Sequence, residues 1–251
     1  GSPQVYLTII VGATALLWFI LRQSNRKQPM LNFGVYRYPM FALSSVITMV
    51  LNMAMFSGML LLPIYVQTIR GIDPFEAGLM LLPGALAMAF MSPITGKLFD
   101  KFGGKVLAIT GITILVVTTY YLSELTMETT YGFLMVLHAI RMFGISMVMM
   151  PVSTNGLNQL PRSFYPHGTA MNNTLNQVSG AIGTALLVTV MANRSVTHGN
   201  VMMEKALGDL GSQPSGAALA ALELEVSMLA TLEGINDAFF VATCISAVAL
   251  I

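Results

Sequence analysis

Two basic side chains lie inside an apolar stretch of the chain, where burying a charge is costly. Arg141 is near the middle of residues 130–151, and His138 precedes it by one helical turn. An arginine at that depth must face protein or water, so Arg141 either ties to backbone carbonyls or faces a polar cavity. Because two positive charges so close would repel each other, we expect a neutral His138, either a structural residue or a proton relay.

Amide side chains form a second candidate group within another apolar stretch, residues 168–192. Asn172, Asn173, Asn176 and Gln177 occupy little more than one helical turn. Amides in hydrocarbon must find hydrogen-bonding partners. They therefore either join neighbouring helices or line a polar cavity.

A third group shares one helical face of residues 39–68, by the spacing of three and four residues. It consists of Asn52, Met55, Phe56 and Met59. Asn52 offers both a donor and an acceptor, and methionine surfaces adapt to many ligand shapes. The face is either part of a substrate cavity or a packing surface with its methionines toward lipid.

The elements that position these residues are membrane helices. The chain of 251 residues is 55% hydrophobic and 9% charged, whereas soluble domains are about 25% charged. Its single cysteine, Cys244, excludes a disulfide within the chain and a cysteine-based metal site. The sequence predicts an all-α fold, a polytopic bundle with spans of about 20 residues. The expected spans are about 5–21, 39–68, 76–96, 105–123, 130–151, 168–192 and 235–251.

Basic residues predict the direction of these spans. Eight of them fall in alternate connections, and three fall in the others, so the first set is assigned to the cytoplasm. The cytoplasmic set is Arg22, Arg26, Lys27, Arg37, Lys97, Lys101, Lys105 and Arg162. The longest connection, about 193–234, is then an extracytoplasmic loop, with one short helix expected over 217–232.

The connection between the third and fourth spans contains three glycines, one acid and a terminal lysine: Gly96, Asp100, Gly103, Gly104 and Lys105. Glycines allow close helix approach and a tight turn, and the acid can pair with a basic side chain or cap a helix. This pattern resembles the loop that links the second and third helices of each half in the major facilitator superfamily. The resemblance implies a gating role for these five residues.

Further segments resemble the same family in the same order. Residues 73–84 resemble the entry to the second helix of a half, and residues 141–146 resemble the arginine motif of the fourth. Residues 167–183 resemble the fifth helix of the C-terminal half in fourteen-span drug:proton antiporters, of the EmrB/QacA and lincomycin-exporter kind. The implied organisation is a last central helix with its cytoplasmic linker (1–28) and a C-terminal six-helix half (29–251).

The resemblance implies a proton-coupled multidrug exporter in the cell membrane that takes amphipathic drug substrates. In that family the arginine of the N-terminal half takes part in proton coupling, so Arg141 has either a coupling or a structural role. The spans contain acids only near their ends, such as Asp237. The coupling carboxylates are therefore expected in a missing N-terminal half, without which this chain should be inactive.

Other functions are weighed against this one. A facilitator that exports a lipid or small metabolite is the nearest alternative. An intramembrane serine protease is disfavoured because His138 and Ser146 share one helix, and the metalloprotease motif His-Glu-x-x-His is absent from the sequence. We expect no cofactor, no metal and no nucleic-acid partner, with the proton gradient as the energy source and the lipid bilayer as the surroundings.

Overall fold

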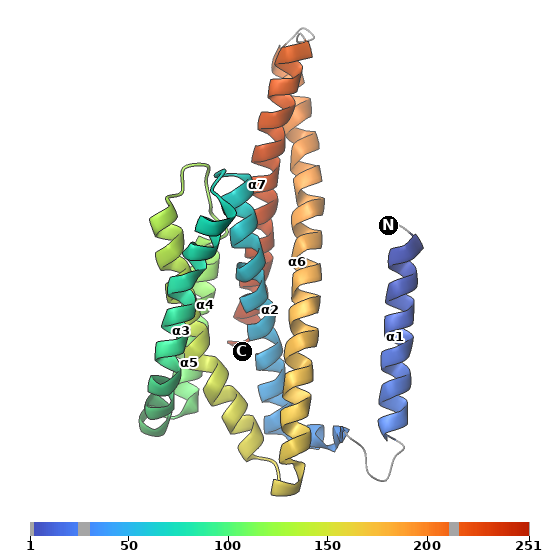
Figure 1. Ribbon diagram of the computed structural model, residues 1–251, viewed down its shortest axis with the longest axis vertical. Coiled ribbons are helices and arrows are strands. Elements are labelled where there is room, and N and C mark those ends of the chain that lie inside the picture. Colours follow the sequence, from blue (N-terminus) through green and yellow to red (C-terminus); the bar gives the residue numbers. More distant parts are fainter. Residues whose placement is uncertain (1–2, 25–30, 211–215, 251) are drawn as a thin grey trace.

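A computed structural model describes residues 3–24, 31–210 and 216–250, and these residues are almost entirely helical. The α-helices are α1 (Pro3–Ser24), α2 (Pro39–Thr68), α3 (Pro74–Phe102), α4 (Gly104–Tyr121), α5 (Tyr131–Asn158), α6 (Tyr165–Leu210) and α7 (Gly216–Val248). Short 3-10 helices precede α2 (η1, Phe33–Arg37) and α6 (η2, Arg162–Phe164). The predicted all-α membrane bundle is confirmed (Figure 1).

Local sequence sets several helix ends. Pro39 and Pro74 occupy the first positions of α2 and α3, where proline costs no hydrogen bond. The Asp73 carboxylate caps α3 by accepting a hydrogen bond from the Phe75 amide at 2.8 Å. The predicted span 39–68 therefore coincides with α2.

Five of the described helices, α2 to α6, are long and apolar enough to cross a membrane. The sequence predicts seven spans. The described apolar stretch of α1, Ile10–Gln23, is shorter than the others, and α7 carries acids over its first two-thirds. Figure 1 shows α1 beside the bundle and separate from it.

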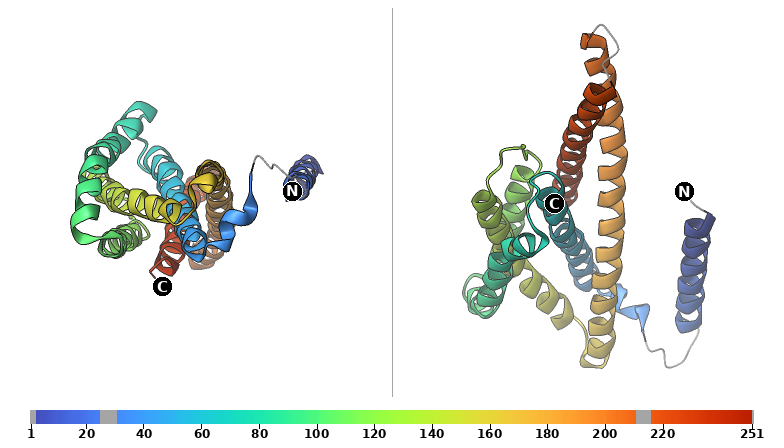
Figure 2. Two further views of the ribbon diagram at one scale, coloured as in Figure 1. Left: turned by 90° about the horizontal axis from the view of Figure 1, so that it is seen from below. Right: turned by 45° about the horizontal axis from the view of Figure 1, so that its top comes forward.

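Helices α2 and α5 form the centre of the bundle. α5 packs against α2, α3 and α4, while α2 also packs against α6 and α7. The end-on view in Figure 2 shows α3 and α4 on one side of this centre and α6 on the other. Buried Tyr65, Met80 and Phe239 belong to a core to which α2, α3 and α7 contribute. Leu51 and Leu115 belong to a second core shared by α2, α4 and α5.

The expected turn between the third and fourth spans is much shorter than predicted. α3 stays helical through Phe102 and α4 begins at Gly104, so Gly103 alone separates them. Gly103 has φ 78° and ψ 160°, a backbone region that is essentially restricted to glycine. Gly96 and Asp100 therefore lie on the last turns of α3 rather than in a loop.

The prediction of an extracytoplasmic loop at 193–234 with one short helix is wrong in form. α6 continues unbroken to Leu210 and α7 begins at Gly216, so the segment is a helical hairpin. The 46 residues of α6 give a length of about 69 Å, more than twice the hydrocarbon thickness of about 30 Å. The hairpin therefore projects well beyond the rest of the bundle (Figure 1).

Candidate functional site

Arg141 is the most deeply buried charged side chain of the described residues, with 0% of its surface exposed. Its Nε donates to Thr119 Oγ1 of α4 at 3.1 Å. Its Nη2 donates to Ser57 Oγ at 3.1 Å and to the backbone carbonyl of Ala54, both on α2. The guanidinium lies directly against Gly58.

These contacts connect the centre of α5 to α2 and α4. The carbonyl and hydroxyl acceptors satisfy most of the guanidinium, although Nη1 has no hydrogen-bond partner among the described residues. Because the guanidinium is fully buried and donates to a backbone carbonyl and two hydroxyls, the geometry fits the structural alternative raised by the sequence. Whether Arg141 also couples to protons stays a prediction.

His138 lies one turn from Arg141 but contacts a different helix. It is 3% exposed, and its ring rests where a side chain at Gly84 of α3 would otherwise lie. Its Nδ1 has no hydrogen-bond partner in the part of the chain that the structure describes. α5 thus presses two polar side chains against two glycines, Gly58 on α2 and Gly84 on α3.

The amide of Asn52 joins α2 to α6. Its Nδ2 donates to Asn176 Oδ1 at 2.9 Å and to the Thr48 carbonyl at 2.8 Å. Asn52 is 2% exposed. Two residues predicted separately, 124 positions apart, are therefore direct partners in a helix–helix contact.

The other predicted cavity residues divide between the protein interior and its surface. Asn172 is buried and donates to Ser153 of α5 at 3.5 Å, and Met55 packs against the core shared by α2, α4 and α5. Asn173 and Gln177 are exposed, as is Met59.

Phe56 and Gln177 line a groove of about 590 Å³ between α2 and α6. Gly180 forms part of its floor against the Phe56 ring, and Thr184 and Thr189 add hydroxyls farther along. All the lining side chains are uncharged. Of the predicted cavity residues, Phe56 and Gln177 line this groove, whereas the exposed Asn173 and Met59 lie outside its lining.

The predicted gating residues lie around the junction of α3 and α4. Gly96 and Asp100 line a groove of about 300 Å³ with Met150 and Asn158 of α5. The described ion pairs do not include Asp100, so the structure shows no basic partner for it. Lys105 is exposed, and Gly104 lies against Phe99.

A groove between α3 and α5 was not among the predicted sites. It has a volume of about 310 Å³, and its lining residues are Met88, Ser92, Ser146, Met149, Met150, Ser153 and Thr154. Three methionines are each followed four residues later by a hydroxyl residue. That spacing puts each pair on one helical face and was the available signal.

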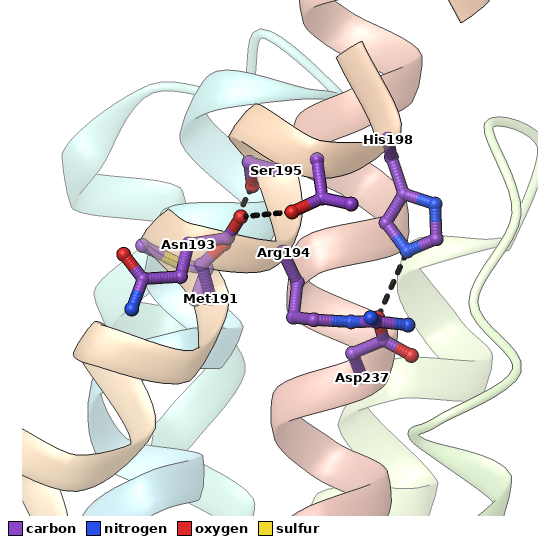
Figure 3. A network of polar contacts seen from close by, with 7 residues as sticks. Met191, Asn193, Arg194, Ser195, His198 and Asp237 are labelled. Carbon is purple, nitrogen blue, oxygen red and sulfur yellow. Dashed lines mark hydrogen bonds and ion pairs between the residues drawn. The ribbon is translucent and has the colours of Figure 1, made fainter. Parts of the chain in front are cut away.

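A polar cluster joins α6 to α7 at the base of the hairpin (Figure 3). The Asp237 carboxylate pairs with Arg194 Nε at 2.5 Å and with His198 Nε2 at 2.9 Å. Nearby, Gly234 packs directly against Ser195 and the Met191 carbonyl. Among the described residues, groups of three or more His, Cys, Asp or Glu side chains placed to hold a metal ion do not occur.

A multi-helix membrane bundle with amide contacts and uncharged grooves between its spans fits a membrane transport protein. The sequence profile of the Major Facilitator Superfamily matches residues 5–184. The chain belongs to this superfamily. It is therefore a multi-pass membrane protein of a transporter family and not an enzyme.

Several curated relatives support the same assignment. The chain is 48% identical over 204 residues to the uncharacterized MFS-type transporter YhcA of Bacillus subtilis (strain 168), covering 81% of this chain and 38% of YhcA. It is 43% identical over 241 residues to the lincomycin resistance protein LmrB of the same organism, covering 96% of this chain and 50% of LmrB. LmrB of Listeria monocytogenes is 44% identical over 221 residues, covering 88% of this chain and 46% of that protein. The chain thus spans half or less of the length of these relatives.

Proposed function

We propose that this chain is the C-terminal half of a proton-coupled multidrug exporter. Residues 1–28 supply the last central helix with its linker, and residues 29–251 supply one lobe of a two-lobed carrier. The similarity to LmrB over 96% of this chain but 50% of LmrB supports the proposal that the chain is about half of such a transporter. Lincomycin is accordingly the first substrate to test.

The observation that carries the proposal is the uncharged groove between α2 and α6. Phe56 offers an aromatic surface, while Gln177, Thr184 and Thr189 offer hydrogen bonds. Such a mixture suits amphipathic molecules of varied shape, because few of its contacts demand one geometry. The hydrogen bond between the buried Asn52 and the half-buried Asn176 joins the two helices that form the groove.

Energy coupling is assigned to the other lobe. Proton exchange requires a group that titrates in the membrane, and the carboxylates of this chain lie near or beyond the ends of its apolar stretches. We therefore propose that the coupling carboxylates lie in the N-terminal half. The lobes rock against each other within the bilayer, driven by the proton gradient without a cofactor.

The test uses the full-length transporter that contains this chain, reconstituted into lipid vesicles. An imposed proton gradient should drive lincomycin transport, and a protonophore should abolish it. This chain reconstituted alone should give no transport. Lincomycin movement that does not depend on the proton gradient would contradict the proposal. So would a full-length protein that fails to transport lincomycin both with the gradient and with the protonophore.

A matched pair of variants tests the groove itself. Phe56→Ala removes the aromatic wall and should raise the KM for lincomycin more than it lowers the maximal rate, because the contact contributes uniformly to binding. Phe133→Ala removes an exposed phenylalanine on α5 and should leave both parameters unchanged. If the two variants have the same KM and maximal rate, the α2–α6 groove is not part of the substrate path.

A further inference from the structure

We infer that the groove between α3 and α5 is a second ligand subsite, which takes an uncharged amphipathic segment of the substrate. This inference rests on the proposed export function. The groove lies outside α2 and α6, the helices that carry the Asn52–Asn176 pair. The methionine–hydroxyl groove, as we call it, is lined by Met88, Ser92, Ser146, Met149, Met150, Ser153 and Thr154.

The hydroxyls of this groove are available to a ligand. Among the described residues, Ser92 and Thr154 have no hydrogen-bond partner for their hydroxyls. Ser146 Oγ donates to the Phe143 carbonyl at 2.7 Å, which leaves its acceptor capacity unused. A ligand with hydroxyl, ether or amide groups therefore meets both donors and acceptors.

The methionines provide the complementary apolar surface. Met88 and Met149 are half-buried, and Met150 is 46% exposed, so each has sulfur or methyl surface toward the groove. Unbranched thioethers repack around different shapes and contact aromatic rings favourably. The groove thus combines an adaptable apolar wall with hydrogen-bonding positions four residues away.

Charge recognition is excluded from this subsite by its lining. All seven side chains are uncharged, so a ligand cation must be neutralised elsewhere in the transporter. Asp100 lies in the adjoining groove of about 300 Å³, which shares Met150 and Thr154 with the methionine–hydroxyl groove. That adjoining groove connects the subsite to the α3–α4 junction.

The subsite also adjoins the amide cluster of α6. Asn172 Nδ2 lies 3.5 Å from Ser153 Oγ, one of the groove residues. A ligand held against Ser153 is therefore near the contact between α5 and α6. This adjacency makes the groove part of one ligand-binding wall formed by α3, α5 and α6.

The test uses cysteine protection in the full-length transporter. Cys244 is replaced by alanine, and Ser92→Cys places a thiol in the groove; Thr113→Cys, an exposed position on α4, is the matched control. Lincomycin at ten times its dissociation constant should slow maleimide labelling of the Ser92→Cys protein about tenfold, by mass action. Labelling at the control position should not change.

A second pair of variants separates occupancy from a conformational effect. Met149→Ala should raise the KM for lincomycin roughly fourfold or more, because each lost methylene contact weakens binding by about that factor. Met228→Ala, a half-buried methionine on α7, should leave the KM unchanged. If Ser92→Cys fails to assemble, Thr154→Cys provides the same protection measurement.

The outcomes distinguish the subsite from the export function. If the parent protein transports lincomycin but lincomycin does not protect thiols at positions 92 and 154, the subsite is overturned while the export function stands. An unchanged KM for lincomycin in Met149→Ala has the same consequence. Absence of transport by the parent protein overturns the proposed function instead. A thiol at position 92 that resists labelling even without lincomycin shows a groove filled by the other lobe, and this also overturns the subsite.

Discussion

The guanidinium of Arg141 lies against the backbone of Gly58, in space that a side chain at position 58 would fill. This contact brings the centres of α2 and α5 together around a fully buried charge. The charge is accommodated because the Ala54 carbonyl and the hydroxyls of Ser57 and Thr119 accept hydrogen bonds from it. A small residue on one helix and a polar side chain on the other are characteristic of helix packing in membranes.

Gly58→Ala should destabilise the bundle strongly. The added methyl group would overlap Arg141 Nη1 and force the guanidinium from its acceptors. Overpacking of this kind typically costs about 1–3 kcal/mol. Thermal unfolding of the purified protein in detergent measures the effect, and Gly132→Ala, where a Cβ meets open space, is the control. Equal melting temperatures for both variants would show that Arg141 relaxes without loss.

Gly84→Ala should be destabilising in a way that removal of His138 relieves. A Cβ at position 84 would lie 2.6 Å from His138 Cδ2 and 2.9 Å from its Nε2. The double variant Gly84→Ala/His138→Ala provides room for the methyl group, so the two effects should be non-additive. Unfolding midpoints of both single variants and the double variant test this. Strict additivity would mean that the two residues do not interact.

The Asn52–Asn176 hydrogen bond should contribute measurably to the association of α2 and α6. Interhelical hydrogen bonds in membranes contribute about 0.6 kcal/mol on average and roughly 1–2 kcal/mol in model peptides. Asn52→Leu and Asn176→Leu should therefore each reduce stability, and the double variant should lose less than their sum. A double-mutant cycle on the unfolding free energy measures the coupling, with zero coupling as the contrary result.

Gly234→Ala should loosen the helical hairpin at its base. A Cβ there would lie 2.5 Å from the Met191 carbonyl oxygen, which belongs to the α6 backbone and cannot rotate away. Hydrogen–deuterium exchange should rise in residues 193–210 and 216–234, with little change in α4. Gly208→Ala has open space around its Cβ and should behave like the parent. Unchanged exchange in Gly234→Ala would show that the hairpin is held elsewhere.

Gly103→Ala should strain the α3–α4 junction. Its φ of 78° and ψ of 160° cost a non-glycine residue about 1–3 kcal/mol. Gly104→Ala meets only the rotatable ring of Phe99 and should be milder. A lower melting temperature for Gly103→Ala than for Gly104→Ala is expected, and the reverse order would contradict the backbone argument.

Hydropathy located α2 to α6, the five described helices that are long and apolar enough to cross a membrane, because hydrocarbon requires long apolar segments whatever their tertiary partners. It did not predict where α3 and α6 end. α3 continues to Phe102 and α6 to Leu210, through polar residues that hydropathy assigns to loops. Helix formation in water depends on local propensity and on packing of α6 against α7, which apolar patterning does not report.

For the candidate site, the sequence alone determined which polar side chains occupy apolar helices and which of them share a helical face, since helix geometry is local. Tertiary structure decided which partner each one meets. Asn52 finds Asn176 from a helix 124 residues away, and Arg141 uses a backbone carbonyl that every residue possesses. The methionine–hydroxyl groove likewise exists only because α3 and α5 pack side by side. Contacts between distant helices depend on how whole surfaces fit together, which local spacing does not encode.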